Sequence, residues 1–269
     1  MTRFIAAMDH SGGSTGGVLE RYGRIYTEEN KMNRVHQMRM RMVNSSSFNS
    51  DNIWAAILYK DTVERGMVKI LGEMGIDTFL KIDDGCKENG TLKDFDVRGM
   101  CQYAVEHDNK IYGTKMRSII TCVDMIDAVL EQQFKLAHTV QEYGLMPIIE
   151  PEVPIDHKDK AIIEYFLAER LEKTLQGRDW QCILKLTPPE TANQYENLTD
   201  NHAVKQVVFL SGGYKLDEAC WRLIHNDNVT ASFSRALTEH LYHDLDNEAF
   251  DEQLSYNIED IVEACSIEL

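Results

Sequence analysis

The sequence predicts a single-domain (β/α)₈ barrel over residues 1–269. Eight short β-prone runs recur along the chain, and most of them are followed by a longer helical pattern. No linker, low-complexity tract or abrupt change of composition divides the chain. A doubly wound sheet is the structural alternative, but it usually has fewer strands, and its glycine-rich dinucleotide fingerprint is missing.

The expected strands are apolar, β-branched or aromatic runs bounded by polar or glycine-containing segments. In chain order they are 3–9 (RFIAAMD), 53–60 (IWAAILYK), 77–83 (DTFLKID), 111–118 (IYGTKMRS), 145–153 (LMPIIEPEV), 179–187 (DWQCILKLT), 204–211 (VKQVVFLS) and 229–237 (VTASFSRAL). Between them, segments such as 123–144 and 159–175 carry apolar residues at helical spacing. This alternation of strand and helix is what a parallel barrel requires.

The amino-acid composition argues against some classes of binding partner. The net charge is −16, from 28 basic and 44 acidic residues, which argues against nucleic-acid or anionic-membrane binding. No apolar run approaches the roughly 20 residues of a membrane span. The six cysteines are scattered without a C-x-x-C pair, which indicates reduced thiols and a cytoplasmic location. The oligomeric state is left open.

The strand at 179–187 places a lysine where a buried charge would be costly. Side chains alternate across a strand, so Cys182, Leu184 and Leu186 share one face. That all-apolar face suits packing under helices. We therefore expect Lys185, on the other face, to point into the barrel.

The same alternation turns further charged residues inward, near the carboxyl ends of their strands. In barrels of this kind, that end carries the chemistry. A charge that ends a strand can simply meet water, but charges from five strands that converge on one mouth favour a site. The expected inward-facing ionisable residues are Asp9, Lys81, Lys115, Arg117, Glu150, Glu152 and Lys185.

This set can perform imine chemistry. A lysine among other cations and apolar walls has a lowered pKa, and its free amine can attack a ketone. The protonated imine is an electron sink for a carbanion on the adjacent carbon. Glu150 and Glu152 are candidates to shuttle the protons, since a buried carboxylate beside another has a raised pKa, and Asp9 could move the proton of a substrate hydroxyl.

Three glycine- or serine-rich loops indicate phosphate binding. The segments 211–214 (SGGY) and 232–237 (SFSRAL) belong to the ends of strands seven and eight, the recurrent phosphate site of such barrels. Arg235 could add a bidentate contact there. The loop 9–17 (DHSGGSTGG) could hold a second phosphate. The side chains that could join it are Ser11, Ser14 and Lys81.

A metal site is not expected. The chain has nine histidines but neither an H-E-x-x-H motif nor a local cluster of ligands. His240 and His243 share an acidic, helix-like segment and are read as surface residues. Cys182 lies on the helix-facing side of its strand and is read as core.

In these motifs the chain resembles class I fructose-bisphosphate aldolases, especially their shorter bacterial form. The matching stretches follow the family order and cover nearly the whole chain: FIAAMDHSGGST, FLKID, YGTKMRS, PIIEPEV, ILKLT, FLSGGY and ASFSRAL. The chain departs from animal members at His10, where they have an acidic residue, and at Ser234, where they have glycine.

The resemblance implies that Lys185 is the Schiff-base lysine, that Glu150 is the main acid/base with Glu152 beside it, and that Asp9 assists carbon–carbon cleavage. It implies that Lys115 and Arg117 are active-site cations. It assigns the distal phosphate to Lys81, Ser11 and Ser14, and the other phosphate to Ser211, Gly212, Ser234 and Arg235.

The expected function is reversible cleavage of fructose 1,6-bisphosphate to dihydroxyacetone phosphate and glyceraldehyde 3-phosphate, without a metal or other cofactor. The alternative among enzymes is another Schiff-base aldolase, or a transaldolase, acting on a different phosphosugar. The alternative from another class is a non-catalytic binding protein built on a barrel, although a binder has no need of Lys185, Glu150 and Asp9 together.

Overall fold

The computed structural model describes residues 3–11 and 13–267. It confirms a single-domain (β/α)₈ barrel: eight strands form one sheet in the order β1 to β8, and each strand pairs in parallel with the next. The strands are β1 (Phe4–Met8), β2 (Ile53–Leu58), β3 (Asp77–Lys81), β4 (Gly113–Ile119), β5 (Met146–Glu152), β6 (Cys182–Leu186), β7 (Val204–Phe209) and β8 (Val229–Ala231).

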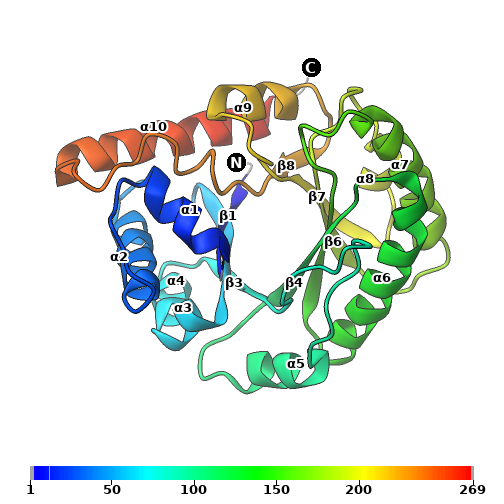
Figure 1. The fold of residues 1–269 in the computed structure, drawn as a ribbon, viewed down its shortest axis with the longest axis horizontal. Helices are drawn as coiled ribbons and strands as arrows, with labels where there is room; N and C mark the ends of the chain where they lie inside the picture. Colours follow the sequence, from blue (N-terminus) through cyan, green and yellow to red (C-terminus); the bar gives the residue numbers. More distant parts are fainter. Residues whose placement is uncertain (1–2, 12, 268–269) are drawn as a thin grey trace.

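Helices surround this ring of strands (Figure 1). They are α1 (Gly13–Arg21), α2 (Lys31–Val43), α3 (Lys60–Glu64), α4 (Met67–Glu73), α5 (Val97–Glu106), η1 (Val123–Met125), α6 (Ile126–Glu142), α7 (Lys160–Leu175), α8 (Glu196–Thr199), α9 (Leu216–Ile224) and α10 (Asn247–Ser266). The helical patterns expected at 123–144 and 159–175 are confirmed by η1 with α6 and by α7.

The barrel is nearly closed between its first and last strands. The Ala7 amide of β1 donates to the Phe233 carbonyl at 3.0 Å, just beyond β8. The Ser232 amide donates to the Phe209 carbonyl at 2.7 Å and extends the pairing of β8 with β7. The β8 strand itself ends at Ala231, so the expected strand 229–237 is too long. Its last part instead forms turns, in which the Thr238 amide bonds back to the Ser234 carbonyl.

Two apolar clusters sandwich the strands. The larger one lies between strands and helices and contains Leu184, as the alternation predicts. The smaller one fills the barrel interior and includes Ile5, Ile57, Ile148 and Ile183. Each fully buried side chain of this kind contributes about 1.5–3 kcal/mol relative to an exposed one. The inner cluster lies below the mouth of the barrel and supports the side chains that line it.

Aromatic rings close the lower part of the interior. Trp54, Phe79 and Tyr112 pack edge to face, with centroids 5.4 to 6.1 Å apart. Strand alternation across 111–118 would put Tyr112 on the side opposite Lys115, yet its ring packs against the inner cluster. Tyr112 precedes β4, and its ring packs against Trp54 and Phe79 at the base of the interior.

The cysteines, the helices and the two histidines of the segment 240–243 bear on three further expectations. All six cysteines are free thiols, and Cys182 is buried in the helix-facing cluster, as expected. Within the part of the chain that the structure describes, no helix combines the length and apolar character needed to cross a membrane. The segment around His240 and His243 forms turns, so the helix expected there is wrong, although the His240 side chain is 64% exposed.

Candidate active site

Four charged side chains form a buried row at the mouth, which we call the charge row: Lys185, Glu150, Lys115 and Asp9. Three lie on β6, β5 and β4, and Asp9 directly follows β1. Lys185 Nζ lies 3.3 Å from Glu150 Oε1, and Lys115 Nζ lies 3.0 Å from Glu150 Oε2. Lys115 Nζ also lies 2.6 Å from Asp9 Oδ2. The four side chains are only 3 to 11% exposed. The signs alternate along the row, so no buried charge is left without an opposite one.

The strands aim these side chains by simple alternation. Ile183 and Ile148 belong to the inner cluster, and Lys185 and Glu150 follow them by two residues on the same face. Beneath Lys115 the equivalent position is Gly113, where a Cβ would stand only 2.0 Å from the Met146 carbonyl oxygen. Only glycine allows β4 to approach β5 so closely at the base of the row.

The row fixes the charge of two of its members. Burial alone would raise the pKa of Asp9, but the ammonium groups of Lys115 and Lys185 outweigh it and hold that pKa well below its usual range. Burial would lower the pKa of Lys115, but Asp9 and Glu150 outweigh it and raise that pKa. At neutral pH Asp9 is therefore a carboxylate and Lys115 an ammonium ion.

The second carboxylate of β5 has a different partner. Glu152 accepts a bidentate pair of bonds from Arg117, from Nε at 2.6 Å and from Nη2 at 2.8 Å. The guanidinium is 40% exposed, so this pair lies at the rim rather than in the row. Glu150 thus contacts the two lysines of the charge row, whereas Glu152 contacts Arg117.

The expected distal-phosphate cation lies on the β3 side of the mouth. Lys81 Nζ donates to the Asp83 carbonyl oxygen at 2.6 Å and lies 3.1 Å from Asp83 Oδ1. Asp83 in turn accepts from the Gly85 and Arg117 amides. Lys81 is therefore beside Asp83 as predicted, with part of its charge already compensated.

The loop after β7 makes a tight turn opposite Lys81. Gly212 and Gly213 adopt φ values of +59° and +120°. A Cβ on Gly212 would meet Ile155 Cγ2 at 2.5 Å, so this turn requires glycine for both conformation and space. A Cβ on Gly213 would stand 3.2 Å from Arg235 Nη1, which places the guanidinium of Arg235 against the turn.

These side chains surround one cavity of about 380 Å³, within the range of about 300–1,000 Å³ usual for small-molecule sites. The structure brings together most of the predicted residues. The walls of the cavity include Asp9, Lys81, Lys115, Arg117, Glu150, Glu152, Lys185, Ser211, Gly212, Ser234 and Arg235. Ser11 follows the lining residue His10 but is not itself placed in the wall, and the side chain of Ser14 lies outside the described part of the chain.

Six further residues line the cavity, namely Ala7, His10, Gly17, Arg21, Leu210 and Ser232. Three of them, His10, Gly17 and Ser232, belong to segments expected to bind phosphate but were not singled out, and Arg21 was missed. Ser232 could have been found by alternation, because it lies two residues before Ser234 on the same face. Its hydroxyl is buried and has no hydrogen-bond partner among the described residues. Arg21 lies four residues after Gly17 on α1, a spacing that would have placed it on the same helix face.

His10 joins the charge row to the loop after β8. Its ring nitrogens lie 3.4 Å from Ser234 Oγ. The buried Arg39 of α2 donates to the His10 carbonyl oxygen at 2.9 Å and so fixes the peptide group that follows His10. Burial lowers the pKa of His10 to about 4, helped by Arg39 and opposed by Asp9. The imidazole is neutral at pH 7.

Within residues 3–11 and 13–267, no three histidine, cysteine, aspartate or glutamate side chains gather in a way that could hold a metal ion. The carboxylates of the mouth contact lysine and arginine instead.

Comparison with known proteins gives the fold. No protein-family model matches the chain. Among solved structures, the chain is similar to fructose-bisphosphate aldolase from Plasmodium falciparum, determined in complex with TRAP and a small-molecule inhibitor. The TM-score is 0.78 at 21% sequence identity, and the match covers 98% of this chain and 90% of that chain.

Two archaeal structures match less closely. An archaeal fructose 1,6-bisphosphate aldolase gives a TM-score of 0.54 at 11% identity, covering 97% of this chain and 94% of that chain. Another, whose catalytic lysine is covalently bound to the carbinolamine intermediate of the substrate, gives 0.54 at 10% identity, covering 95% and 93%. At these identities the likeness establishes a shared barrel fold.

Proposed function

We propose that this chain is a class I fructose-bisphosphate aldolase. It would cleave fructose 1,6-bisphosphate reversibly to dihydroxyacetone phosphate and glyceraldehyde 3-phosphate, through an imine on Lys185 and without a metal. The proposal includes a phosphosugar as the ligand and a cytoplasmic location. It rests first on the sequence motifs, and the fold it shares with aldolases of low identity is consistent with it.

The observation that carries the proposal is the charge row. Lys115 contacts two carboxylates, whereas Lys185 contacts one among the described residues, Glu150, which it shares with Lys115. Burying four ionised groups costs stability that an apolar core of the same volume would not, so a protein that only binds a ligand gains little from this arrangement. A proton donor and acceptor within 3.3 Å of an amine is what imine formation requires.

The proposed steps use the contacts of the charge row. Glu150, 3.3 Å away, takes a proton from the Lys185 ammonium group, and the free Nζ attacks C2 of the ketose. Glu150 then returns the proton with which the carbinolamine oxygen leaves as water, and the imine keeps the positive charge. The iminium ion draws the electrons of the C3–C4 bond while Asp9, ionised at neutral pH, takes the proton of the C4 hydroxyl. Glyceraldehyde 3-phosphate departs and leaves an enamine. Protonation at C3 and hydrolysis of the imine then release dihydroxyacetone phosphate.

Lys115 has a separate role in this scheme. Its raised pKa keeps it charged throughout, so it serves as a fixed cation between Glu150 and Asp9 rather than as a nucleophile. It would stabilise the negative charge that develops on substrate oxygens as the bond breaks. The other members of the row exchange protons around it.

Trapping of the imine tests the proposal directly. Incubation with dihydroxyacetone phosphate and borohydride should attach the three-carbon unit irreversibly to Lys185, because reduction freezes the C=N bond. Peptide mass mapping locates the modified residue. Labelling of another lysine, or absence of labelling, would overturn the assignment.

A chelator tests the metal-independent part separately. Because the iminium ion serves as the electron sink, activity should be nearly unchanged after treatment with a strong chelator. Loss of activity that zinc restores would point to a metal-dependent mechanism instead.

A further inference from the structure

Arg39 is a buried cation that the proposed mechanism does not use. It lies on α2, is 1% exposed, and is among the largest fully buried side chains of the described residues. Within that part of the chain, its guanidinium contacts a hydroxyl and a carbonyl group but no carboxylate. Burying a charge without an ionic partner is costly, and an apolar side chain of similar size would avoid the cost. The charge at this position therefore needs an explanation.

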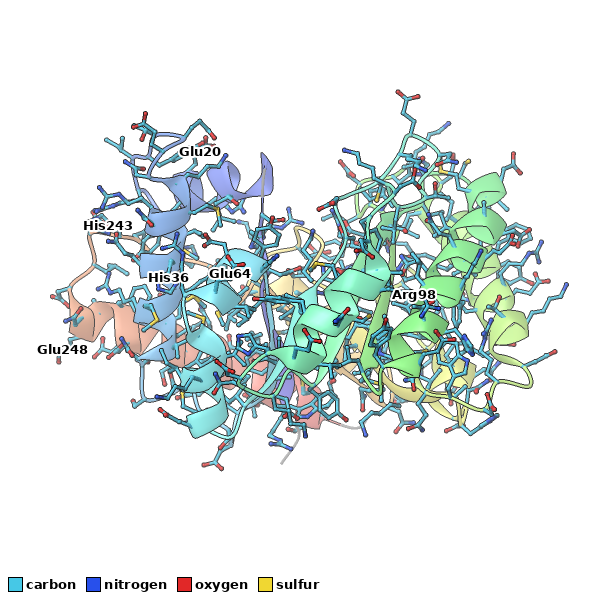
Figure 2. All side chains as sticks on the ribbon, turned by 90° about the horizontal axis from the view of Figure 1, so that it is seen from below. Glu20, His36, Glu64, Arg98, His243 and Glu248 are labelled. Atoms are coloured by element: carbon cyan, nitrogen blue, oxygen red, sulfur yellow. The ribbon has the colours of Figure 1, made fainter. Side chains whose placement is uncertain are left out.

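The guanidinium joins three segments of the chain. Nη1 donates to the hydroxyl of Thr62 on α3, and Nη2 donates to the His10 carbonyl oxygen at 2.9 Å. Figure 2 labels His36 on α2 and Glu64 on α3, and Figure 1 shows the same two helices side by side, outside the strands. Arg39 thus reaches from these helices to the segment that directly follows β1.

Two acidic residues attract Arg39 from a longer distance, Asp9 and Asp61. Asp61 already has a partner, because Arg65 binds both of its carboxylate oxygens, at 2.7 Å and 3.1 Å. Burial lowers the pKa of Arg39 to about 10 against the opposing charges of these two aspartates, so the guanidinium is positive at neutral pH. Asp9 consequently lies between two cations, Lys115 inside the barrel at 2.6 Å and Arg39 outside the strands.

The segment after β1 needs an external anchor. Residues 9–17 (DHSGGSTGG) contain four glycines, and a glycine-rich backbone does not fix its own direction. The His10 ring lies 3.4 Å from Ser234 Oγ, which is a long contact. The bond from Arg39 to the His10 carbonyl is shorter and comes from the buried face of a helix. It fixes the point at which the chain leaves β1.

A simpler explanation is that Arg39 only ties α2 to its neighbours. Arg41, two residues later, makes such a tie elsewhere: it donates to three backbone carbonyl oxygens of residues 243–246, and its guanidinium lies 4.1 Å from the centre of the Phe250 ring. Arg41 lines neither cavity. If both arginines were only ties, loss of either one would lower stability and leave the balance of the reaction steps unchanged.

We propose that Arg39 is a positioning residue for Asp9: it holds the peptide group after His10 from outside the strands, and so keeps the Asp9 carboxylate directed at the substrate hydroxyl. This role rests on the proposed function, in which Asp9 takes the proton of the C4 hydroxyl while Lys185 and Glu150 form the imine. Arg39 should therefore affect cleavage of the carbon–carbon bond more than formation of the imine.

The test compares Arg39→Met with Arg41→Met, which removes the same group from the same helix. A misplacement of about 1 Å can cost roughly 10²-fold in rate, so kcat for cleavage of fructose 1,6-bisphosphate should fall by roughly 10- to 10²-fold in Arg39→Met. Labelling of Lys185 by dihydroxyacetone phosphate and borohydride should proceed as in wild type. In Arg41→Met both measurements should stay close to wild type, although the melting temperature should fall.

A second variant and a second measurement cover the case in which Arg39→Met folds poorly. Arg39→Lys keeps the charge but loses the planar fork that reaches Thr62 and His10 together, so its kcat should be intermediate. Hydrogen exchange of backbone amides in residues 9–17, followed by mass spectrometry, should be faster in Arg39→Lys than in wild type or in Arg41→Lys. This readout needs no turnover.

Three outcomes would overturn the proposal. The Arg39 and Arg41 variants could lower kcat equally, which would reduce Arg39 to a tie between helices. Imine labelling and cleavage could fall by the same factor in Arg39→Met, which would remove the link to Asp9. Exchange in residues 9–17 could be the same in Arg39→Lys and wild type. Absence of labelling at Lys185 in the wild-type protein would instead contradict the proposed function, and the exchange measurement would still decide whether Arg39 holds this segment.

Discussion

The charge row and the rim of the same cavity handle charge in opposite ways. In the row, Lys185, Glu150, Lys115 and Asp9 are buried, and each contacts an opposite charge within 3.3 Å. At the rim, the exposed Arg21 and Arg235 contact no carboxylate among the described residues.

The difference separates two requirements of a reactive site. Buried reacting groups must be stable before the ligand arrives, so they neutralise one another. Cations that bind an anionic ligand must be available to it, so they stay without an internal partner. Changes in the row should therefore affect chemistry and folding together, because removing one partner of a buried pair typically costs about 3–5 kcal/mol. Changes at the rim should affect ligand binding alone.

The largest expected effect is the loss of the nucleophile. Lys185→Met should reduce turnover to background, because no amine remains to form an imine. The protein should still fold, with a lower melting temperature, since Glu150 loses one ion pair but keeps its contact with Lys115 at 3.0 Å. Lys185→Arg is the matched control: it keeps a positive charge near Glu150 but cannot form an imine, so it should be equally inactive. Turnover measured in either variant would contradict the role given to Lys185.

Glu150→Gln should have the next largest effect. The amide keeps the shape of the side chain but cannot shuttle protons, so the rate should fall by roughly 10²–10⁴. It also leaves Lys185 without a carboxylate contact, so the melting temperature should fall. Stopped-flow measurement of imine formation and a thermal melt give the two readouts.

Glu152→Gln is the comparison for Glu150→Gln. It breaks the rim pair with Arg117 and leaves the charge row intact, so it should change turnover less than Glu150→Gln. If Glu152→Gln were inactive and Glu150→Gln close to wild type, the two roles would be reversed.

The sequence predicts which residues belong to the charge row, but it does not predict which of them contact one another. Alternation along single strands turned Lys115, Glu150 and Lys185 inward. Which carboxylate meets which lysine depends on the stagger between strands: the register sets Arg117 opposite Glu150, yet the ion pairs are Lys115 with Glu150 and Arg117 with Glu152. Each side chain leans along its strand, so the ion pairs are displaced from the backbone register. The sequence pattern of one strand does not contain this displacement.

The rim was less predictable because it is built from loops and helix ends. The glycine-rich loops were found, since Gly212 and Gly213 are typical of a tight turn. Arg21 was missed because α1 begins inside what the sequence presents as a glycine loop, so its helical spacing from Gly17 was not visible. Strand β8 ends at Ala231, and Arg235 therefore reaches the cavity from a turn.

Arg235→Ala tests whether a change at the rim affects ligand binding without affecting stability. We expect kcat/KM for fructose 1,6-bisphosphate to fall by roughly 10²-fold, because a charged hydrogen bond to the ligand is lost. The melting temperature should be unchanged, in contrast to Glu150→Gln. Fructose 6-phosphate has no phosphate on C1, so its rate should change little. Equal losses on both substrates would mean that Arg235 supports the fold rather than the phosphate.

The smallest effect on turnover at neutral pH is expected for His10, which lies between the two regions. Its ring contacts Ser234 of the rim loop, and Asp9 precedes it in the row. The imidazole is uncharged at pH 7, so His10→Asn should leave the charge of the site unchanged there. The variant should differ from wild type mainly in acid.

The sign of that difference follows from the lowered pKa of His10, about 4 in the native state against 6.5 for the unperturbed side chain. Between these values the unfolded chain binds a proton that the native protein does not, so native stability falls as the pH drops from about 6.5 to about 4, by at most about 3 kcal/mol. His10→Asn removes this contribution, and urea denaturation at pH 7 and pH 4.5 should show a smaller loss than in wild type. His240→Asn, the same replacement at an exposed histidine, is the control and should keep the wild-type pH dependence. If His10→Asn and wild type lost equal stability on acidification, the neutral buried imidazole would not be what links the charge row to the rim.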